Sequence, residues 1–406
     1  ANANLNLTRR QQVVRWWSTA HEREAASVHD RPRKRTRPVA NIQTGEPGVL
    51  NRRGLLQAGA GGLLTALAGS SAPGAAASVA RQATVEDGAP VAVGFYIPDA
   101  VYDYATISRF AAEIRRWPAY LVWYEGWSDG DFDEENMETL HRLDGWGFVP
   151  VIAWDPFDPL GPPIDQPAYK LSNVLRGDFD DYIDSWAEGL AKFNKRVFLN
   201  FAHEMNGNWY PWGIGVNGNQ PGEFIAVWRY VHDRFAAAGA SNVLWVHTPN
   251  ELYEDVPATI EQVYPGDEYV DWFGMNGFNW GEDIHWESCD CQSAWRTFRE
   301  IFDTTYRQLV ALADKPIMIG EFASSEVGGN KADWITTAYL DDIPNLYPRI
   351  RAVAWFNKVA TGLDTVAPGV VEPTTTSVDW RVTSSPEALA AFVEAVADPY
   401  YQGTLR

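Results

Sequence analysis

The stretch FLNFAHEMNGNWYPW, Phe198–Trp212, joins a short apolar run to a polar and aromatic segment. Its first residues belong to the run Val197–Phe201. This run is predicted to be a buried β-strand because it is short, apolar and rich in aromatic residues. His203 and Glu204 follow directly, so a carboxylate stands at the C-terminal end of a predicted strand. The alternative interpretation is a structural glutamate that pairs with an arginine in a loop.

A second carboxylate has an equivalent setting in KPIMIGEFAS, Lys315–Ser324. There Glu321 ends another apolar, strand-like run. Near the first carboxylate, Trp209 and Trp212 offer flat faces on which a sugar ring could stack. Two carboxylates that face each other are what glycoside hydrolysis requires, so the two stretches together predict a sugar-cleaving site.

Strand-like and helix-like segments alternate along the chain from Val91 onward. The predicted strands are Val91–Ile97, Tyr120–Tyr124, Val149–Trp154, Val197–Phe201, Val243–His247, Trp272–Asn276, Pro316–Gly320 and Ala352–Phe356. The predicted helices are Ile107–Arg116, Asp180–Phe193, Phe224–Ala237, Trp295–Leu312, Trp334–Leu340 and Pro386–Val396. This alternation predicts an α/β fold, a (β/α)8 TIM barrel over residues 91–400, with its site at the C-terminal ends of the strands. An open doubly wound sheet is the alternative, but no glycine-rich turn follows the first strand.

The strand order places Glu204 at the end of strand four and Glu321 at the end of strand seven, so they can face each other across the barrel. Further aromatic and polar residues stand at the other strand ends: Trp123, Trp127, Trp154, Asp155, Phe278, Trp280, Trp355 and Asn357. Some of them must be packing residues. Aromatic residues at the same end of six strands nevertheless predict a sugar-binding cleft.

Four motifs carry a family resemblance: HEMNGNWYPW (residues 203–212), IGEFAS (319–324), AWFN (354–357) and DWRVTSSPEALAAF (379–392). Over roughly residues 90–398 the chain resembles glycoside hydrolase family 26, retaining TIM-barrel enzymes best known for β-mannanases. The resemblance implies that Glu204 is the general acid/base and Glu321 the nucleophile. It also implies that His203 contacts the substrate, and that Trp209 and Trp355 are aromatic contacts near the cleaved bond.

Two positions depart from the mannanase pattern. Phe278 stands where mannanases usually have a tyrosine that hydrogen-bonds the nucleophile, and Trp154 is followed by Asp155 rather than by a histidine. The hydrogen-bond donor to Glu321 is therefore His203, Asn276 or a water molecule, and the sequence does not decide among them.

The roles of the two glutamates require that their pKa values be held apart. We expect Trp209 to disfavour the charged form of Glu204 by desolvation, and donors near Glu321 to favour its carboxylate. This chemistry needs no cofactor and no metal.

The first 90 residues differ from the rest in composition. Residues 1–50 are basic, contain RPRKRTRP at Arg31–Pro38, and are predicted to be disordered or upstream of the true start. Residues 51–80 resemble a twin-arginine export signal, with Arg52 and Arg53 before an uncharged, modestly apolar run, and residues 81–90 would be a linker. The alternatives are an uncleaved membrane anchor around Leu55–Ala68, or an ordinary helix, which its many glycines disfavour.

The net charge of -20 makes nucleic acid an improbable partner, because phosphate binding needs a basic face. Residues 1–50 carry nine Lys and Arg against four Asp and Glu, and residues 51–80 add two Arg, so residues 81–406 carry -27. Such an acidic body indicates a strongly solvated surface. The two cysteines, Cys289 and Cys291, are too close for an ordinary disulfide and too few for a zinc site.

Together these observations predict an exported, monomeric, retaining endo-β-glycanase, extracellular or at the cell surface. Its first expected substrate is β-1,4-mannan, followed by mixed-linkage β-glucan or another β-linked polysaccharide. A barrel that binds polysaccharide without cleaving it is the alternative of another class, and the two carboxylates argue against it. No membrane partner is expected unless the signal-like segment stays uncleaved.

Overall fold

The computed structural model describes residues 90–162, 164–252, 257–283, 285–286, 291–361 and 377–405. The predicted basic segment, signal-like segment and nearly all of the linker lie outside these residues. Within them, eight parallel strands close into a barrel, in the order β1-β10-β9-β6-β5-β4-β3-β2. The strands are β1 (Ala92–Tyr96), β2 (Tyr120–Gly126), β3 (Val149–Asp155), β4 (Val197–Phe201), β5 (Val243–His247), β6 (Trp272–Asn279), β9 (Ile317–Ser324) and β10 (Ile350–Phe356). The predicted (β/α)8 barrel is confirmed.

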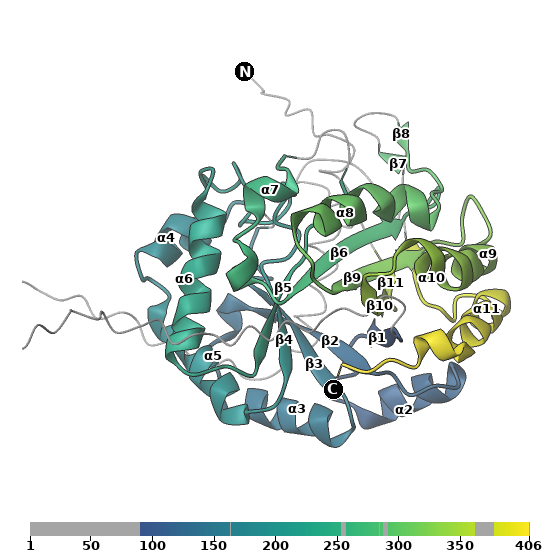
Figure 1. Cartoon of the computed structure of the whole chain (residues 1–406), viewed down its shortest axis with the longest axis horizontal. Helices are drawn as coiled ribbons and strands as arrows, with labels where there is room; N and C mark the ends of the chain where they lie inside the picture. The colour runs from purple at the N-terminus through teal and green to yellow at the C-terminus, as the bar shows by residue number, and fades with distance from the viewer. Residues whose placement is uncertain are drawn as a thin grey trace, which may run out of the picture. The chain divides into compact units, whose positions relative to one another are not determined.

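Helices surround the strands (Figure 1). The longer ones are α2 (Tyr104–Glu113), α3 (Glu134–Gly145), α5 (Asp180–Phe193), α6 (Glu223–Ala237), α8 (Phe298–Leu312) and α11 (Pro386–Ala397). Shorter segments are α4 (Leu171–Leu175), α7 (Ile260–Val263), α9 (Lys331–Thr336), the π-helix η4 (Thr337–Asp342) and α10 (Ile343–Leu346). Both faces of the strands are buried, one in the barrel interior and the other under the helices, as is usual for parallel sheets.

Most predicted elements match the structure in position, and the differences lie at their ends. Strands β4 and β5 have the predicted bounds, whereas β6 and β9 each continue three or four residues further toward their C-terminal ends. Glu321 therefore lies inside β9 rather than after it. Helix α3 was not predicted, because its buried side is small: Thr139, Leu140 and Leu143 are its buried residues.

The barrel interior depends on one close approach between neighbouring strands. Gly94 of β1 pairs with Tyr120 of β2, and the Tyr120 ring fills the space beside it. A Cβ atom on residue 94 would lie 2.4 Å from that ring, so only glycine fits there.

The seam between the first and last strands is closed by the C-terminal segment as well as by β10. Strand β1 pairs with β10 along its whole length. Val91 N donates to Tyr400 O at 2.7 Å, and Gly403 N donates to Val91 O at 3.0 Å. The segment after α11 thus holds the start of β1 in place.

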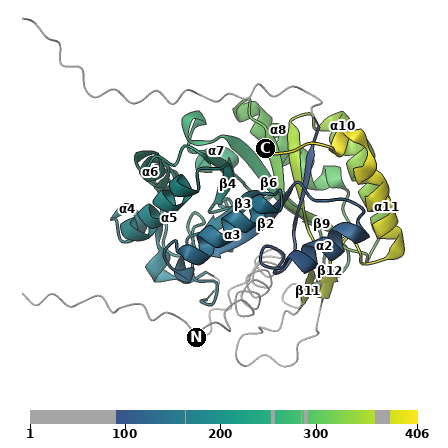
Figure 2. The ribbon, with the colours of Figure 1, turned by 90° about the horizontal axis from the view of Figure 1, so that it is seen from below.

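Two small hairpins accompany the barrel, β7 (His285–Trp286) with β8 (Cys291–Gln292), and β11 (Val359–Thr361) with β12 (Ser377–Asp379). The β11–β12 hairpin lies at one end of the barrel (Figure 2). Among the described residues, no helix combines the length and the apolar character needed to cross a membrane. The possible anchor Leu55–Ala68 and Cys289 lie outside those residues, and the side chain of Cys291 is not described.

Candidate active site

The loop after β4 carries Glu204 in an unusual backbone conformation. Ala202 and Glu204 have φ angles of 46° and 55°, in the left-handed region that non-glycine residues rarely adopt. Glu204 N donates to Thr248 O at 2.7 Å. The Asn206 side chain pairs with the Asn250 backbone, donating to its O at 3.1 Å and accepting from its N at 2.8 Å. The loop after β5 therefore fixes this conformation and the direction of Glu204.

The carboxyl group of Glu204 is buried and receives two hydrogen bonds. Trp209 Nε1 donates to Oε2 at 2.7 Å, and Asn276 Nδ2 of β6 donates to Oε1 at 3.1 Å. Trp209, which was expected to desolvate Glu204, contacts the carboxyl group through its N–H.

Glu321 points into the barrel from β9 and is almost fully buried. The Tyr124 hydroxyl of β2 donates to its Oε1 at 2.5 Å, and His203 Nε2 lies 3.8 Å from the same oxygen. Its Oε2 accepts no hydrogen bond from the residues that the structure describes. The donor that the sequence left open between His203, Asn276 and water is therefore Tyr124, while Asn276 binds Glu204.

His203 links Glu321 to a further buried acid. Its Nδ1 lies 3.0 Å from Asp155 Oδ1 at the end of β3. Burial lowers the pKa of His203, but the Asp155 charge and hydrogen bond, with the charges of Glu321 and Glu204, outweigh it and raise the pKa to about 9. His203 is thus a cation near neutral pH, held between two acids.

Burial also raises the pKa of Glu321, which reaches about 8. The charge of His203 and the hydrogen bond from Tyr124 lower this pKa, and the charges of Glu204 and Asp155 raise it. The donors near Glu321 favour its carboxylate, as expected, but the loss of hydration on burial is the larger effect on its pKa.

The two carboxyl groups lie close together. One oxygen of each, together with one ring nitrogen of His203, form a set in which all atoms are within 4.8 Å of one another. This closeness fits the separation of about 5 to 5.5 Å in retaining glycosidases rather than about 6.5 to 9.5 Å in inverting ones. The same three atoms could approach a metal ion, but a protonated His203 donates a hydrogen bond and cannot act as a ligand.

Aromatic side chains form a cluster at the C-terminal ends of β6 and β10. Phe278 stacks on Trp380 with ring centroids 4.7 Å apart, and Trp280 meets the same ring edge-on at 4.8 Å. Phe356 of β10 contacts Phe278 and Trp380 and continues the group toward β1. We call Phe278, Trp280, Phe356 and Trp380 the aromatic wall.

Three residues that were predicted to contact the substrate lie outside the site, so the prediction is wrong for them. Trp123 packs against Trp186 of α5, and Trp154 donates through Nε1 to Tyr182 OH of the same helix at 3.0 Å. Trp355 is fully buried against α9 and α11 and donates to Trp380 O at 2.6 Å. All three side chains point outward from their strands, into the layer between sheet and helices. His203, Trp209, Asp155, Phe278 and Trp280 do gather around the two carboxyl groups or in the aromatic wall.

Tyr124 and Trp380 were not among the residues predicted for the site. Successive side chains of a strand point to opposite faces, so Trp123 and Tyr124 cannot both point inward. A signal existed for Tyr124, because the mannanase pattern has a phenol that hydrogen-bonds the nucleophile and strand two offers one at its end.

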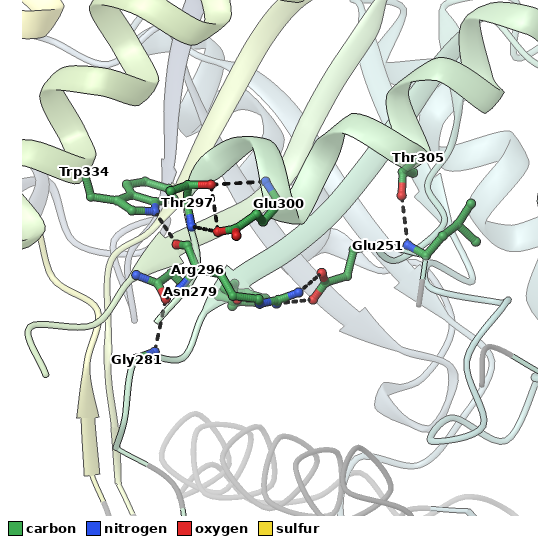
Figure 3. Close-up of polar contacts among 10 residues, drawn as sticks. Glu251, Asn279, Gly281, Arg296, Thr297, Glu300, Thr305 and Trp334 are labelled. Carbon is green, nitrogen blue, oxygen red and sulfur yellow. Dashed lines mark hydrogen bonds and ion pairs between the residues drawn. The ribbon is translucent and has the colours of Figure 1, made fainter. Parts of the chain in front are cut away.

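A partly buried ion pair supports the end of β6 (Figure 3). Arg296 binds both carboxyl oxygens of Glu251, at 2.6 and 2.7 Å, and its Nη2 also donates to Phe278 O at 3.0 Å. The Arg296 backbone N donates to Asn279 Oδ1 at 2.9 Å. We call Arg296 and Glu251 the β6 clamp, because they hold the backbone that carries Phe278.

The fold and the paired carboxyl groups are those expected of a glycoside-hydrolase barrel. The model of glycosyl hydrolase family 26 matches residues 140–314. Endoglucanase H of Acetivibrio thermocellus is 37% identical over 254 residues, which are 62% of this chain and 24% of that protein. The resemblance to family 26 that the motifs predicted is confirmed.

Two further comparisons are with mannanases. Mannan endo-1,4-beta-mannosidase A and B of Caldalkalibacillus mannanilyticus is 27% identical over 187 residues, 44% of this chain and 32% of that protein. The chain thus spans less than a third of the length of these curated relatives. The catalytic domain of the GH26 endo-beta-1,4-mannanase of Bacillus sp. JAMB-750 has a TM-score of 0.56 and 19% identity, and the match covers 78% of this chain and 87% of that one. At 19% identity this similarity is evidence for a shared fold alone.

Proposed function

We propose that this chain is a retaining endo-β-glycanase in which Glu204 is the general acid/base and Glu321 the nucleophile. The observation that carries the proposal is the close approach of the two buried carboxyl groups, from the loop after β4 and from β9. A non-catalytic binding barrel would have no need for such a pair, because burying two acids side by side costs stability.

The proposed reaction has two steps. In the first, Glu204 gives its proton to the glycosidic oxygen while ionised Glu321 forms a bond to the anomeric carbon. In the second, Glu204 takes a proton from water, whose oxygen replaces Glu321 at that carbon. Asn276 and Trp209 hold the Glu204 carboxyl group through both steps, because each binds one of its two oxygens.

For the substrate, we place a β-glucan before β-1,4-mannan. The relative named an endoglucanase is 37% identical, against 27% for the mannosidase, and Phe278 and Asp155 stand where the mannanase motif has other residues. Glucose and mannose, the sugar units of these two polysaccharides, differ in the orientation of one hydroxyl group, at C2. The rate of oligosaccharide release from mannan, galactomannan, lichenan and xylan ranks these substrates. Faster release from mannan than from lichenan would reverse our order.

Rescue by azide tests the two roles. We expect Glu321→Ala to lose turnover on every substrate, since no covalent intermediate can form. Glu204→Ala should retain the first step with an activated aryl glycoside, whose leaving group needs no proton. Azide should then accelerate Glu204→Ala and give a β-glycosyl azide. A β-azide from Glu321→Ala instead would mean that the roles are reversed.

We also propose that the protein is exported by the twin-arginine route and acts as a monomer outside the cell. The support is the sequence of residues 51–80 and the acidic body. Substitution of both Arg52 and Arg53 by Lys should keep the protein in the cytoplasm, as fractionation of expressing cells would show.

A further inference from the structure

Lys331, the first residue of α9, is a buried cation with three oxygen partners. Its Nζ donates to Asp379 O at 3.0 Å, to Arg381 O at 2.8 Å and to Ser384 Oγ at 2.8 Å. An ammonium group has three N–H donors, so each of them has an acceptor. Only 1% of the residue is exposed, and burying a cation costs free energy unless its donors are bonded in this way. The three bonds hold residues 379–384 against the start of α9.

Acids around Lys331 keep it charged at neutral pH. Burial lowers the pKa of Lys331 to about 8, and the charges of Glu326, Asp379 and Asp283 oppose this effect. Ser384 Oγ, which accepts from Lys331, donates to Glu326 Oε1 at 2.5 Å. The ammonium group and one of these carboxylates are therefore joined through a single hydroxyl group.

Trp380 lies between two of the three acceptors. The carbonyl groups of the residues directly before and after it both accept from Lys331. Its own backbone is bonded as well, since its N donates to Lys358 O at 3.0 Å and its O accepts from Trp355 Nε1 at 2.6 Å. The backbone is thereby fixed on both sides of the Trp380 ring.

The Trp380 ring in turn supports the partly exposed member of the aromatic wall. Trp280 meets Trp380 edge-on at 4.8 Å and is partly exposed, whereas the other three rings of the wall are buried. The wall continues toward the nucleophile through Tyr96, which stacks on Phe356 at 4.7 Å and contacts Tyr124 at 4.8 Å. A partly exposed indole at this end of the barrel offers a face to a sugar ring.

Resting on the proposed function, we propose that Lys331 is a positioning residue for polysaccharide binding, which acts by fixing Trp380 and, through it, Trp280. Its three bonds go to residues 379–384, and none of them goes to Glu204 or Glu321. A polysaccharide extends over several sugars beyond the cleaved bond, whereas a small aryl glycoside does not. Loss of the ammonium group should therefore weaken binding of the polymer and leave the chemical steps unchanged.

The test compares the wild-type full chain with Lys331→Met, which keeps the length of the side chain but removes its three donors. On lichenan or mannan, whichever is cleaved faster, KM should rise about 3- to 10-fold, the effect of one lost aromatic contact, with kcat unchanged. KM and kcat for a small aryl glycoside should stay at their wild-type values. Thermal unfolding sets a temperature at which every variant is folded. An equal rise of KM on both kinds of substrate, or no rise on the polymer, would overturn the proposal.

A double-mutant cycle decides whether Lys331 acts through Trp280. Trp280→Ala should raise KM for the polymer at least as much as Lys331→Met, and the double variant should show no further rise. Additive effects would overturn the proposal. If Lys331→Met does not fold, Ser384→Ala takes its place in the cycle, because it removes one of the three acceptors. It should raise KM in the same direction, and an unchanged KM would count against the proposal.

Lys315→Met is the matched control. Lys315 Nζ also donates to a backbone oxygen, Asp267 O at 2.9 Å, but the residue precedes β9 and so lies at the opposite end of the barrel. Its KM should equal that of the wild type, and a rise as large as that of Lys331→Met would overturn the proposal. A wild type that cleaves neither polymer nor aryl glycoside would refute the proposed function, and this inference with it. An active wild type with an unchanged KM in Lys331→Met would refute this inference alone.

Discussion

Glu321 couples catalysis to stability through its pKa. Burial raises that pKa from 4.5 to about 8, so between these values the folded protein keeps a proton that the unfolded chain releases. The contribution of Glu321 to the free energy of unfolding therefore does not change with pH below 4.5, and it falls as the pH rises from 4.5 toward 8. The residue that the reaction needs in its ionised form is thus the one that destabilises the fold when ionised.

Replacement of Glu321 by Gln should remove this pH-dependent loss. Gln keeps a carbonyl oxygen that can accept from Tyr124, so we expect Glu321→Gln to be inactive yet more stable at pH 8, by about 4 kcal/mol, with little gain at pH 4. Urea unfolding at several pH values measures this. Glu188→Gln, the same change on the exposed side of α5, is the control. A gain for Glu321→Gln that is equal at all pH values would contradict the assignment.

At the scale of elements, the β6 clamp should matter more for substrate binding than for chemistry. Arg296→Lys keeps the charge but loses the two-pronged contact with Glu251 and the bond to Phe278 O, so we expect a loss of about 1 to 3 kcal/mol in stability. Because the aromatic wall would shift with Phe278, KM for polysaccharide should rise more than kcat falls on a small aryl glycoside.

Arg307→Lys is the control for the clamp. Arg307 pairs with Asp303 on the exposed side of α8, and such pairs contribute about 0 to 1 kcal/mol. It should change neither KM nor stability measurably. If Arg296→Lys lowers stability without any change in KM, the clamp supports the fold but not the wall.

The strand order was predictable from the sequence, but the direction of the side chains was not. Apolar runs and their spacing gave eight strands and placed Glu204 and Glu321 at one end of the barrel. Strands β2, β3 and β10 are buried on both faces, so hydrophobicity does not distinguish inside from outside. Trp123, Trp154 and Trp355 were therefore assigned to the site although they pack under helices, and Tyr124 was overlooked.

At the scale of the whole molecule, residues 1–80 should be dispensable for folding. A chain that starts at Arg81 keeps β1 and all contacts described for the barrel, so we expect the same cooperative unfolding and the same activity as the full chain. A chain that starts at Gly94 loses part of β1 and should not fold. Circular dichroism and activity measure both. Failure of the first chain to fold would move the domain boundary toward the N-terminus.

The contacts of Val91 with Tyr400 and Gly403 bear on how the protein is made. They join residues more than three hundred positions apart, and β1 pairs with β10 across 260 positions of the chain. A growing chain therefore cannot complete the barrel on the ribosome until the segment around Gly403 has been synthesised, and one edge of β1 stays unpaired until then. Such long-range closure slows folding, because the chain loses the conformational entropy of a large loop before the contacts at the seam form and stabilise it. During that interval the exposed edge of β1 is a surface that chaperones could recognise and at which aggregation could begin.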